Sequence, residues 1–304
     1  MKKLLAAITL FLSISSPAAE IVSIVSPYSA SHSGTPAMQL IVNHANQAQS
    51  KYKFMIEFKP GAEQLLALKE LDSHPTTHLA IIAPKYVEHS IQKTIDPADY
   101  VPIHALGDAC WAVISNLGNE SVGLASLQGQ ENIFVGGVGF GNATHLTSLQ
   151  IAEKFKFKVH YVPFKSNFDA LVNMAGNNGI NLVIDRVSSA RQLQNKNPDI
   201  KILAMSCAVR HPDAAHVKTL EEQGITAPFV FNITVSHRAM SNSKRQELKD
   251  ILDKSTKLVG LDEIQRLSDM RPPVFTNANI DTYFQKNVDL VRQLLKKHQA
   301  SIQP

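Results

Sequence analysis

Residues 135–169 hold two glycine- or polar-rich turns, and this feature constrains the chain more than any other. Each turn follows an apolar run and precedes a segment with helical periodicity, so each is predicted to lie at the N-terminus of a helix. The first N–H groups of a helix have no acceptor within it, and the helix dipole adds positive potential there. Such turns bind a carboxylate or phosphate without any catalytic side chain. The pattern predicts an anion receptor first and an enzyme only second.

The N-terminus has the pattern of a secretory signal peptide. Lys2 and Lys3 precede an apolar stretch at residues 4–14, which small residues follow. The apolar stretch is shorter than the about 20 residues that a membrane-spanning helix needs, so we expect cleavage, after Ala18 or, as the next choice, after Ala19. Residues 1–18 are therefore predicted to be a signal peptide, and the mature chain is expected to be soluble and periplasmic.

Charge, length and cysteine content narrow the class of protein. Without Lys2 and Lys3 the chain has 28 basic and 26 acidic residues, too small an excess to favour nucleic acid or an anionic membrane as partner. A mature length of about 285 residues favours two domains. Cys110 and Cys207 are the only cysteines. They could pair in an oxidising compartment, but no sequence feature brings them together, and we predict two separately buried thiols.

Predicted strands and helices alternate along the chain. Strands are predicted at residues 20–25, 52–58, 78–83, 132–136, 159–162, 181–185, 201–207 and 228–236, and helices at 63–71, 167–175, 242–259 and 280–299, with two more opening at Thr35 and at Asn142. Thr35 is the predicted N-cap of the first helix and Pro36 its first residue. An extended stretch at 101–115 separates two such series. This order predicts right-handed βαβ units, mostly parallel sheets and the α/β class.

Several motifs of the second half occur in a defined order. They are GFGNATHL at residues 139–146, HYVPFKS at 160–166 and TLEEQG at 219–224, preceded by PGA at 60–62. In this order they resemble the signature of the tripartite tricarboxylate transporter substrate-binding receptors, Gly-x-Gly-Ser-x-x-His-Leu, Val-Pro-Tyr-Lys-Gly and Thr-x-x-Glu-x-Gly. The resemblance covers nearly the whole mature chain and is densest between residues 135 and 224.

The resemblance implies a periplasmic-binding-protein-like α/β fold, with two Rossmann-like lobes joined by two crossing strands and the ligand cleft between them. We place the crossings near residues 103–115 and 228–236. Lobe I then comprises residues 19–116 plus 226–304, and lobe II comprises 117–225. In such folds the ligand lies outside the carboxyl ends of the strands.

The resemblance also implies a function. The chain is expected to be an extracytoplasmic solute-binding receptor that captures a small carboxylate-bearing ligand and delivers it to the large and small membrane subunits of a tripartite transporter. It is expected to be monomeric and non-enzymatic, to need no cofactor and to bind no nucleic acid. The alternative is a periplasmic ligand sensor that uses the same cleft to signal to a membrane protein.

The predicted ligand-binding residues are those that match the family's motifs. They come from the loop after the first strand, the end of the third strand, the glycine turn, the turn around the motif lysine and the end of the strand at 181–185. They are Tyr28, Ser29, Ser33, Gly34, Thr35, Ala83, Gly139, Gly141, Asn142, His145, Phe164, Lys165, Ser166 and Asp185. The glycines let the backbone approach a ligand closely. Asn142 caps its helix or donates to the anion, and Asp185 could bind a ligand ammonium or hydroxyl group.

Three of these residues have plainer alternatives. His145 is as well explained by orienting the glycine loop or packing between the lobes. Lys165 fits a solvated turn, because backbone amides can already satisfy the anion. Asp185 fits a turn cap or an ion pair with Arg186 or Arg191.

The motifs also depart from the family's pattern. The family's first loop carries a Pro-x-Gly-Gly-like run, whereas residues 29–34 read Ser-Ala-Ser-His-Ser-Gly. Asn142 stands where the motif has serine, and Ser166 stands where it has glycine. We therefore expect the distal end of the ligand to be recognised differently from the family's pattern.

Other chemistries are disfavoured. Residues 137–142 lack the Gly-x-Gly-x-x-Gly spacing of dinucleotide enzymes, and the Gly-x-Ser-x-Gly motif of serine hydrolases does not occur. The 12 histidines include His74 and His78, four residues apart. Pro75 between them argues against one helix presenting both to a metal ion. Scattered surface histidines and no metal site are predicted, and a zinc receptor is the third alternative.

Overall fold

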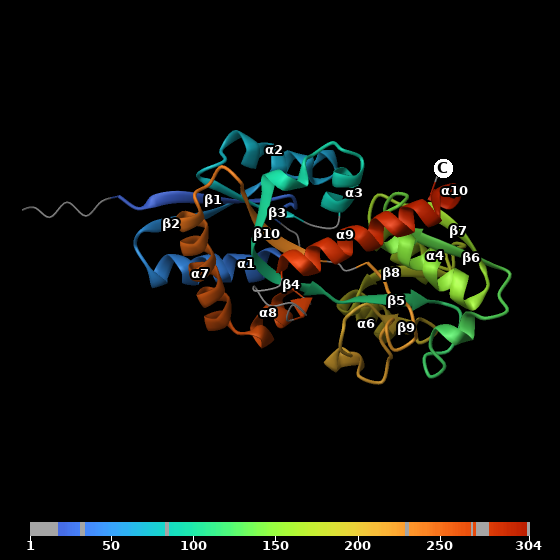
Figure 1. Cartoon of the computed structure of the whole chain (residues 1–304). Coiled ribbons are helices and arrows are strands. Elements are labelled where there is room, and N and C mark those ends of the chain that lie inside the picture. Colours follow the sequence, from blue (N-terminus) through green and yellow to red (C-terminus); the bar gives the residue numbers. More distant parts are fainter. Residues whose placement is uncertain are drawn as a thin grey trace, which may run out of the picture.

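The computed structural model describes residues 18–30, 34–82, 85–228, 231–268, 270–271 and 280–302. Within these ranges the chain forms two α/β lobes, each built on its own mixed sheet (Figure 1). Nearly all of the predicted signal peptide, residues 1–17, lies outside the described residues. Of the helices that the structure describes, none combines the length and apolar character needed to cross a bilayer.

The first sheet has the strand order β11-β4-β10-β3-β1-β2. Its strands are β1 (Glu20–Ser26), β2 (Tyr52–Phe58), β3 (His78–Ile82), β4 (Tyr100–Ala109), β10 (Phe231–His237) and β11 (Met270–Arg271). One face is covered by α1 (Thr35–Ala48), α7 (Asn242–Val259) and α8 (Leu261–Ser268). The other face is covered by α2 (Leu65–Ser73), α3 (Lys85–Ile91) and α9 (Ile280–Lys297). The apolar faces of these helices pack against the sheet and form two hydrophobic cores, one on each side of it.

The second sheet has the order β7-β6-β8-β5-β9. Its strands are β5 (Trp111–Ser115), β6 (Asn132–Gly137), β7 (Lys158–Pro163), β8 (Leu182–Arg186) and β9 (Lys201–Met205). On one face pack α5 (Asn167–Ala175) and α6 (Val187–Lys196). On the other pack α4 (Ala143–Phe155) and a short 3-10 turn, η3 (Leu124–Leu127).

Both sheets are mixed, so the prediction of mostly parallel sheets is wrong. The βαβ units do form parallel pairs, β1 with β2 and β3, and β6 with β7 and β8. However, β10 and β4 join the first sheet antiparallel, and β5 joins the second antiparallel. β4 of the first sheet ends at Ala109 and β5 of the second sheet begins at Trp111, so the chain first passes from one sheet to the other at Cys110. This point lies a few residues before the predicted boundary at 116, and the lobe boundaries remain a prediction.

The local elements follow the sequence closely. The predictions for β2, α5 and α7 match residue for residue. The first helix has Gly34 as its N-cap and begins at Thr35, so the prediction of Thr35 as the cap is wrong by one residue. α2 begins at Leu65, after the 3-10 turn η1 (Ala62–Gln64). The short helices α3, α6 and α8 were not predicted.

Cys110 and Cys207 form a disulfide, with their Cα atoms 4.7 Å apart, so the prediction of two separate thiols is wrong. Cys110 lies between β4 and β5, and Cys207 follows β9, which pairs with β5. This ladder aligns two residues that are 97 positions apart in the sequence. The bond ties the first crossing between the lobes to the second lobe.

The C-terminal helix α9 reaches from one lobe to the other (Figure 1). It packs against α3 and β4 of the first lobe and against α4 of the second. Leu146 of α4 shares a buried apolar cluster with Val288 and Val291 of α9. At the end of α9, Lys297 Nζ lies 2.6 Å from Glu153 Oε2 of α4. The short α10 (Gln299–Ile302) follows.

Candidate functional site

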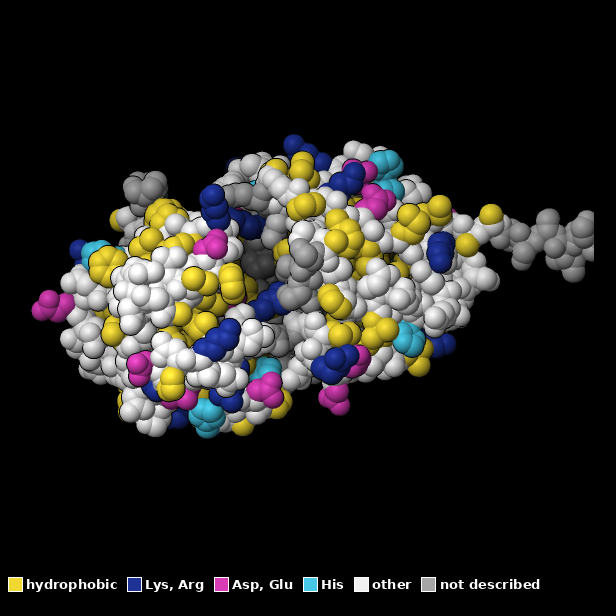
Figure 2. Space-filling model, turned by 180° about the vertical axis from the view of Figure 1, so that it is seen from behind, with side chains coloured by type: hydrophobic (Ala, Val, Ile, Leu, Met, Phe, Trp, Pro, Cys, Tyr) yellow, Lys and Arg dark blue, Asp and Glu magenta, His cyan; other side chains and the backbone are white. Residues whose placement is uncertain are grey.

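A cavity of about 300 Å³ lies between the two sheets, and we call it the interlobe cavity. Its wall combines Tyr28, Gln64, Lys85, Glu88, Ala109 and Asn232, from elements of the first lobe, with Trp111, Val138, Asn142, Ala143, Thr144, Asn167 and Arg186 from the second. Figure 2 shows the surface hollowed between the lobes, with lysine or arginine side chains at the margin of the hollow.

The interlobe cavity lies at the carboxyl ends of parallel strands. Tyr28 follows β1, Val138 follows β6, and Arg186 is the last residue of β8. α/β sheets bind ligands there because the strand-to-helix connections converge at that edge. Trp111 of β5 is the direct ladder partner of Arg186, so both side chains project from the same face of the sheet. Strand register therefore decides which side chains reach the cavity.

The N-terminus of α4 opens into the cavity. Asn142 is the N-cap, as predicted, and its Oδ1 accepts a hydrogen bond from the backbone N–H of His145 at 2.9 Å and from Thr144 Oγ1 at 2.7 Å. The N–H groups of Ala143 and Thr144 precede that of His145 and have no acceptor within the helix. Both residues belong to the cavity wall, so this helix end offers two backbone donors to a ligand.

The N-terminus of α5 lies at the same cavity. Ser166 is its N-cap and accepts the N–H of Asp169 at 3.1 Å, while Asn167, the first helical residue, lines the cavity. Asn167 Oδ1 is buried and has no hydrogen-bond partner among the described residues, and the same holds for Gln64 Oε1 in the opposite wall. A buried polar atom without a partner is unfavourable. A ligand hydroxyl or ammonium group would satisfy these oxygens.

The charged side chains of the cavity wall are Lys85, Glu88 and Arg186, which sum to a net positive charge. Lys85 Nζ lies 2.5 Å from Glu88 Oε2. Burial raises the pKa of Tyr28 far above its usual range, and the positive charge of Arg186 offsets only part of this rise. Tyr28 is therefore neutral and donates to Asn232 Oδ1 at 3.0 Å. A cavity with this charge and two helix N-termini suits an anion.

Two of the predicted ligand-binding residues, Tyr28 and Asn142, line the interlobe cavity. Ser33 and Ala83 lie outside the described residues. The other predicted residues are not part of its wall: Ser29, Gly34, Thr35, Gly139, Gly141, His145, Phe164, Lys165, Ser166 and Asp185. For these ten residues, ligand contact stays a prediction.

The described residues of the first loop lie near the start of α1. Gly34 is buried and caps α1, and Thr35 Oγ1 donates to the carbonyl oxygen of Ser29 at 3.4 Å. Ser29 itself is exposed. Of the described residues of this loop, Tyr28 is the one that lines the cavity.

The two glycines of the glycine turn meet different surroundings. Gly139 and Gly141 have φ of +66° and +75°, in the left-handed region that favours glycine. A Cβ at Gly139 would meet open space, whereas a Cβ at Gly141 would lie 3.1 Å from Ile302 and 3.4 Å from Leu295. The absence of a side chain at Gly141 therefore lets α9 and α10 pack closely against the glycine turn.

His145 is a buried side chain that contacts the glycine turn. It is 1% exposed, its Nδ1 accepts the N–H of Gly141 at 3.0 Å, and its ring stacks on Tyr161 with centroids 4.0 Å apart. Burial, together with the smaller effect of the neighbouring His298, lowers the pKa of His145 to about 4. The imidazole is therefore neutral near pH 7. These contacts match the plainer alternative, in which His145 orients the loop.

The remaining candidates lie around β7 and β8. Phe164 packs against the apolar core of the second lobe, Lys165 is exposed, and Ser166 caps α5. Successive residues of a strand point to opposite faces. Asp185 and Arg186 therefore diverge, and Arg186 is the one that lines the cavity.

Sequence reasoning missed much of the cavity wall. Arg186 is the last residue of β8 and Lys85 follows the end of β3, so the rule that ligands lie at the carboxyl ends of strands could have found them. Trp111 could be assigned only from its register with Arg186. Gln64, with φ of +80°, and Asn232, on the antiparallel β10, carry no signal in the sequence.

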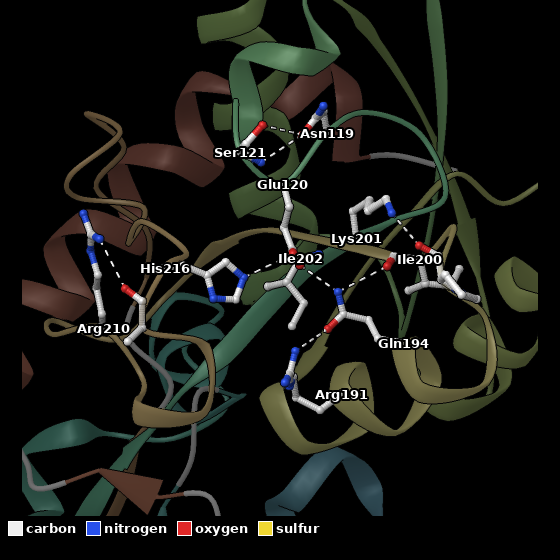
Figure 3. A network of polar contacts seen from close by, with 12 residues as sticks. Asn119, Glu120, Ser121, Arg191, Gln194, Ile200, Lys201, Ile202, Arg210 and His216 are labelled. Carbon is white, nitrogen blue, oxygen red and sulfur yellow. Dashed lines mark hydrogen bonds and ion pairs between the residues drawn. The ribbon is translucent and has the colours of Figure 1, made fainter.

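A second polar cluster surrounds Glu120 in the second lobe (Figure 3). Its carboxylate accepts the N–H of Ile202 at 2.8 Å and the amide of Gln194 at 2.7 Å, and lies 3.2 Å from His216 Nε2. Burial acts to raise the pKa of Glu120, but these three groups outweigh burial and leave the pKa below its usual value. The cluster joins the loop after β5 to α6 and β9, so it anchors the second lobe.

Comparisons with known proteins identify the fold. No model of a protein family matches this chain, and no curated protein matches its sequence. A TctC solute-binding protein from Polaromonas, with no ligand, superposes with a TM-score of 0.76 at 16% identity, over 91% of this chain and 98% of that one. MatC from Rhodopseudomonas palustris, with bound malate, gives 0.64 at 14% identity, over 90% and 98%. Another R. palustris protein, with adipate, gives 0.67 at 16% identity, over 90% and 96%.

These similarities extend over nearly the whole of each chain. At such low sequence identity they establish the fold, and the predicted two-lobed architecture is confirmed. The chain therefore has the two-lobed α/β fold of periplasmic solute-binding proteins.

Proposed function

We propose that this protein is an extracytoplasmic solute-binding receptor, of the tripartite tricarboxylate transporter type, which captures a small carboxylate-bearing ligand between its lobes. The observation that carries the proposal is that α4 and α5 both begin at a cavity whose charged side chains sum to a positive charge. Helix N-termini supply oriented N–H donors, and an arginine adds a charge-assisted hydrogen bond. A carboxylate uses both.

Two further observations support the class of ligand. The proteins of the same fold from R. palustris hold malate and adipate. In the present cavity, Gln64 Oε1 and Asn167 Oδ1 are buried acceptors without a described donor. We infer that the ligand carries a hydroxyl or ammonium group besides its carboxylate.

The proposed location and partners follow from the same reading. The signal-peptide pattern at residues 1–18 and the disulfide both support an oxidising compartment such as the periplasm. The proposed partners are the large and small membrane subunits of a tripartite transporter, which would detect the closed lobes of a monomeric receptor. We propose no catalytic step. The sensor alternative would use the same cavity, and no observation favours it.

A thermal-shift screen of the mature protein tests the proposal. The ligands are mono-, di- and tricarboxylates, with hydroxy acids, amino acids and phosphate alongside. A ligand at about 100 times its dissociation constant adds roughly 2.7 kcal/mol of stability, which raises the melting temperature by several degrees. We expect one carboxylate class to give this rise. A flat response to every carboxylate contradicts the proposal.

A matched pair of variants then tests the position of the ligand. Arg186→Gln should weaken the bound carboxylate by about tenfold to a hundredfold, the usual effect of losing a charge-assisted hydrogen bond. Lys165→Gln makes the same kind of change at an exposed lysine outside the cavity wall, and the affinity should stay the same. Isothermal titration calorimetry measures both. The opposite result would place the ligand at the motif lysine.

A further inference from the structure

Glu70, His74 and His78 gather three metal-ligating side chains between the end of α2 and the start of β3, and we call them the histidine cluster. One ligand atom from each residue lies within 4.8 Å of the others. The two imidazoles stack, with centroids 4.4 Å apart and an interplanar angle of 18°. His74 Nδ1 lies 3.2 Å from Glu70 Oε1. Little movement would be needed for all three to reach one ion.

A turn creates this arrangement, where a continuous helix could not. α2 ends at Ser73, and His74 leaves the helical backbone conformation with φ of −131°. The N–H of His78 donates to the carbonyl oxygen of His74 at 3.0 Å, which closes the turn. Pro75 disfavours continuation of the helix. Pro75 therefore does prevent one helix from presenting both histidines. It lies instead in the turn that brings the two imidazole rings together.

His78 is oriented as metal-binding histidines are. Thr77 Oγ1 lies 3.1 Å from His78 Nδ1, while His78 Nε2 faces Glu57 Oε1 at 3.6 Å. A hydrogen bond at Nδ1 orients the ring and leaves Nε2 to bind metal.

We propose that the histidine cluster binds one Zn²⁺ or a similar divalent transition-metal ion, with Glu57 as a neighbouring oxygen donor. Two imidazoles and a carboxylate suit Zn²⁺, whereas Mg²⁺ and Ca²⁺ prefer oxygen ligands. Lys59 Nζ, 3.2 Å from Glu70 Oε2, competes for the carboxylate, and the ion replaces this contact. The ion enters from the His74 side, because the side chain of His74 is 49% exposed.

The histidine cluster is separate from the interlobe cavity. His78 is the first residue of β3, whereas the cavity lies beyond the carboxyl ends of the strands. Figure 2 shows histidine side chains beside acidic and basic ones on the upper surface of the lobe that carries α2. The proposed metal site is therefore independent of carboxylate binding, and its test does not depend on the proposed function.

Calorimetric titration of the mature protein with ZnCl₂, after metal is removed with EDTA, tests the site. We expect one Zn²⁺ per chain in the wild type. His74→Ala, His78→Ala and Glu70→Gln should each weaken binding by at least about tenfold. His44→Ala removes a histidine of α1, outside the cluster, and should leave binding unchanged. Circular dichroism checks that every variant is folded.

Either of two Zn²⁺ titration results would overturn the proposal. One is no binding of Zn²⁺ in about tenfold excess over micromolar protein; the other is equal binding by the wild type and His78→Ala. If a histidine variant fails to fold, Glu70→Gln decides, because the amide keeps the shape of the carboxylate and removes its charge. Parallel titrations with Ca²⁺ and Mg²⁺ should give weaker binding than Zn²⁺, and the reverse order also contradicts the site.

Discussion

Replacing His145 with asparagine should make the folding of this protein less sensitive to acid. His145 is 1% exposed, and burial lowers its pKa from 6.5 to about 4. Between these two values the unfolded chain binds more protons at this residue than the folded chain does, so stability rises with pH. The contribution of His145 is complete above its unfolded pKa and is lost as the pH falls towards the folded pKa.

The two pKa values set the size of the effect. Proton linkage gives a loss of about 2 kcal/mol between pH 7 and pH 5, out of roughly 3 kcal/mol over the whole window. Asparagine does not titrate in this range, and its amide oxygen can accept the N–H of Gly141 in place of Nδ1. The variant loses the stacking on Tyr161 and is less stable at pH 7. Its further loss on acidification should be smaller than that of the wild type by about 2 kcal/mol.

Urea unfolding at about pH 7 and about pH 5, followed by the fluorescence of Trp111, measures this difference of differences. Other titrating groups are present in both proteins and cancel in the comparison. His44→Asn is the matched control, because it removes one imidazole from α1 and leaves the glycine turn intact. Equal losses in the wild type and in His145→Asn would show that His145 is not a buried neutral imidazole.

Three further changes test other parts of the structure. Cys110→Ser combined with Cys207→Ser should lower the free energy of unfolding by up to about 4–5 kcal/mol, because the bond joins residues 97 apart; an unchanged urea midpoint contradicts this. Gly141→Val should cost roughly 1–3 kcal/mol, because its φ of +75° and the C-terminal helices both oppose a side chain; calorimetry should show a lower melting temperature, and a wild-type value refutes the contact. Glu120→Ala should cost about 1–3 kcal/mol, because it leaves a backbone N–H of β9 without its acceptor. Hydrogen exchange at that amide should become faster, and unchanged protection argues against the anchor.

The sequence predicted those parts of the fold whose signals are local. β2, α5 and α7 have clear periodicity and end signals, and they match residue for residue. Asn142 was identified as the cap of α4 because a cap and the N–H group that donates to it, here that of His145, are three residues apart. The positions of the two helix N-termini at which we propose that an anion binds followed from the same kind of short-range pattern.

The site shows where local reasoning stops. Asp185 was predicted to bind the ligand, but the residue that lines the cavity is its neighbour in the strand, Arg186. Adjacent residues of a strand face opposite sides, and the side that faces the cavity depends on pairing with Trp111 of β5. Lys165 matched a motif but is exposed, whereas Lys85 had no motif and lines the wall.

The sequence by itself determined the α/β class, the order of most elements and the two glycine- or polar-rich turns that open α4 and α5. Only the tertiary structure decided the disulfide, the mixed strand pairing, the packing of α9 and α10 against Gly141, and the turn that stacks His74 on His78. The physical reason is the range of the interactions. Caps, turns and periodicity act within a few residues, whereas strand register and interlobe packing join residues that become neighbours only when the whole chain has folded.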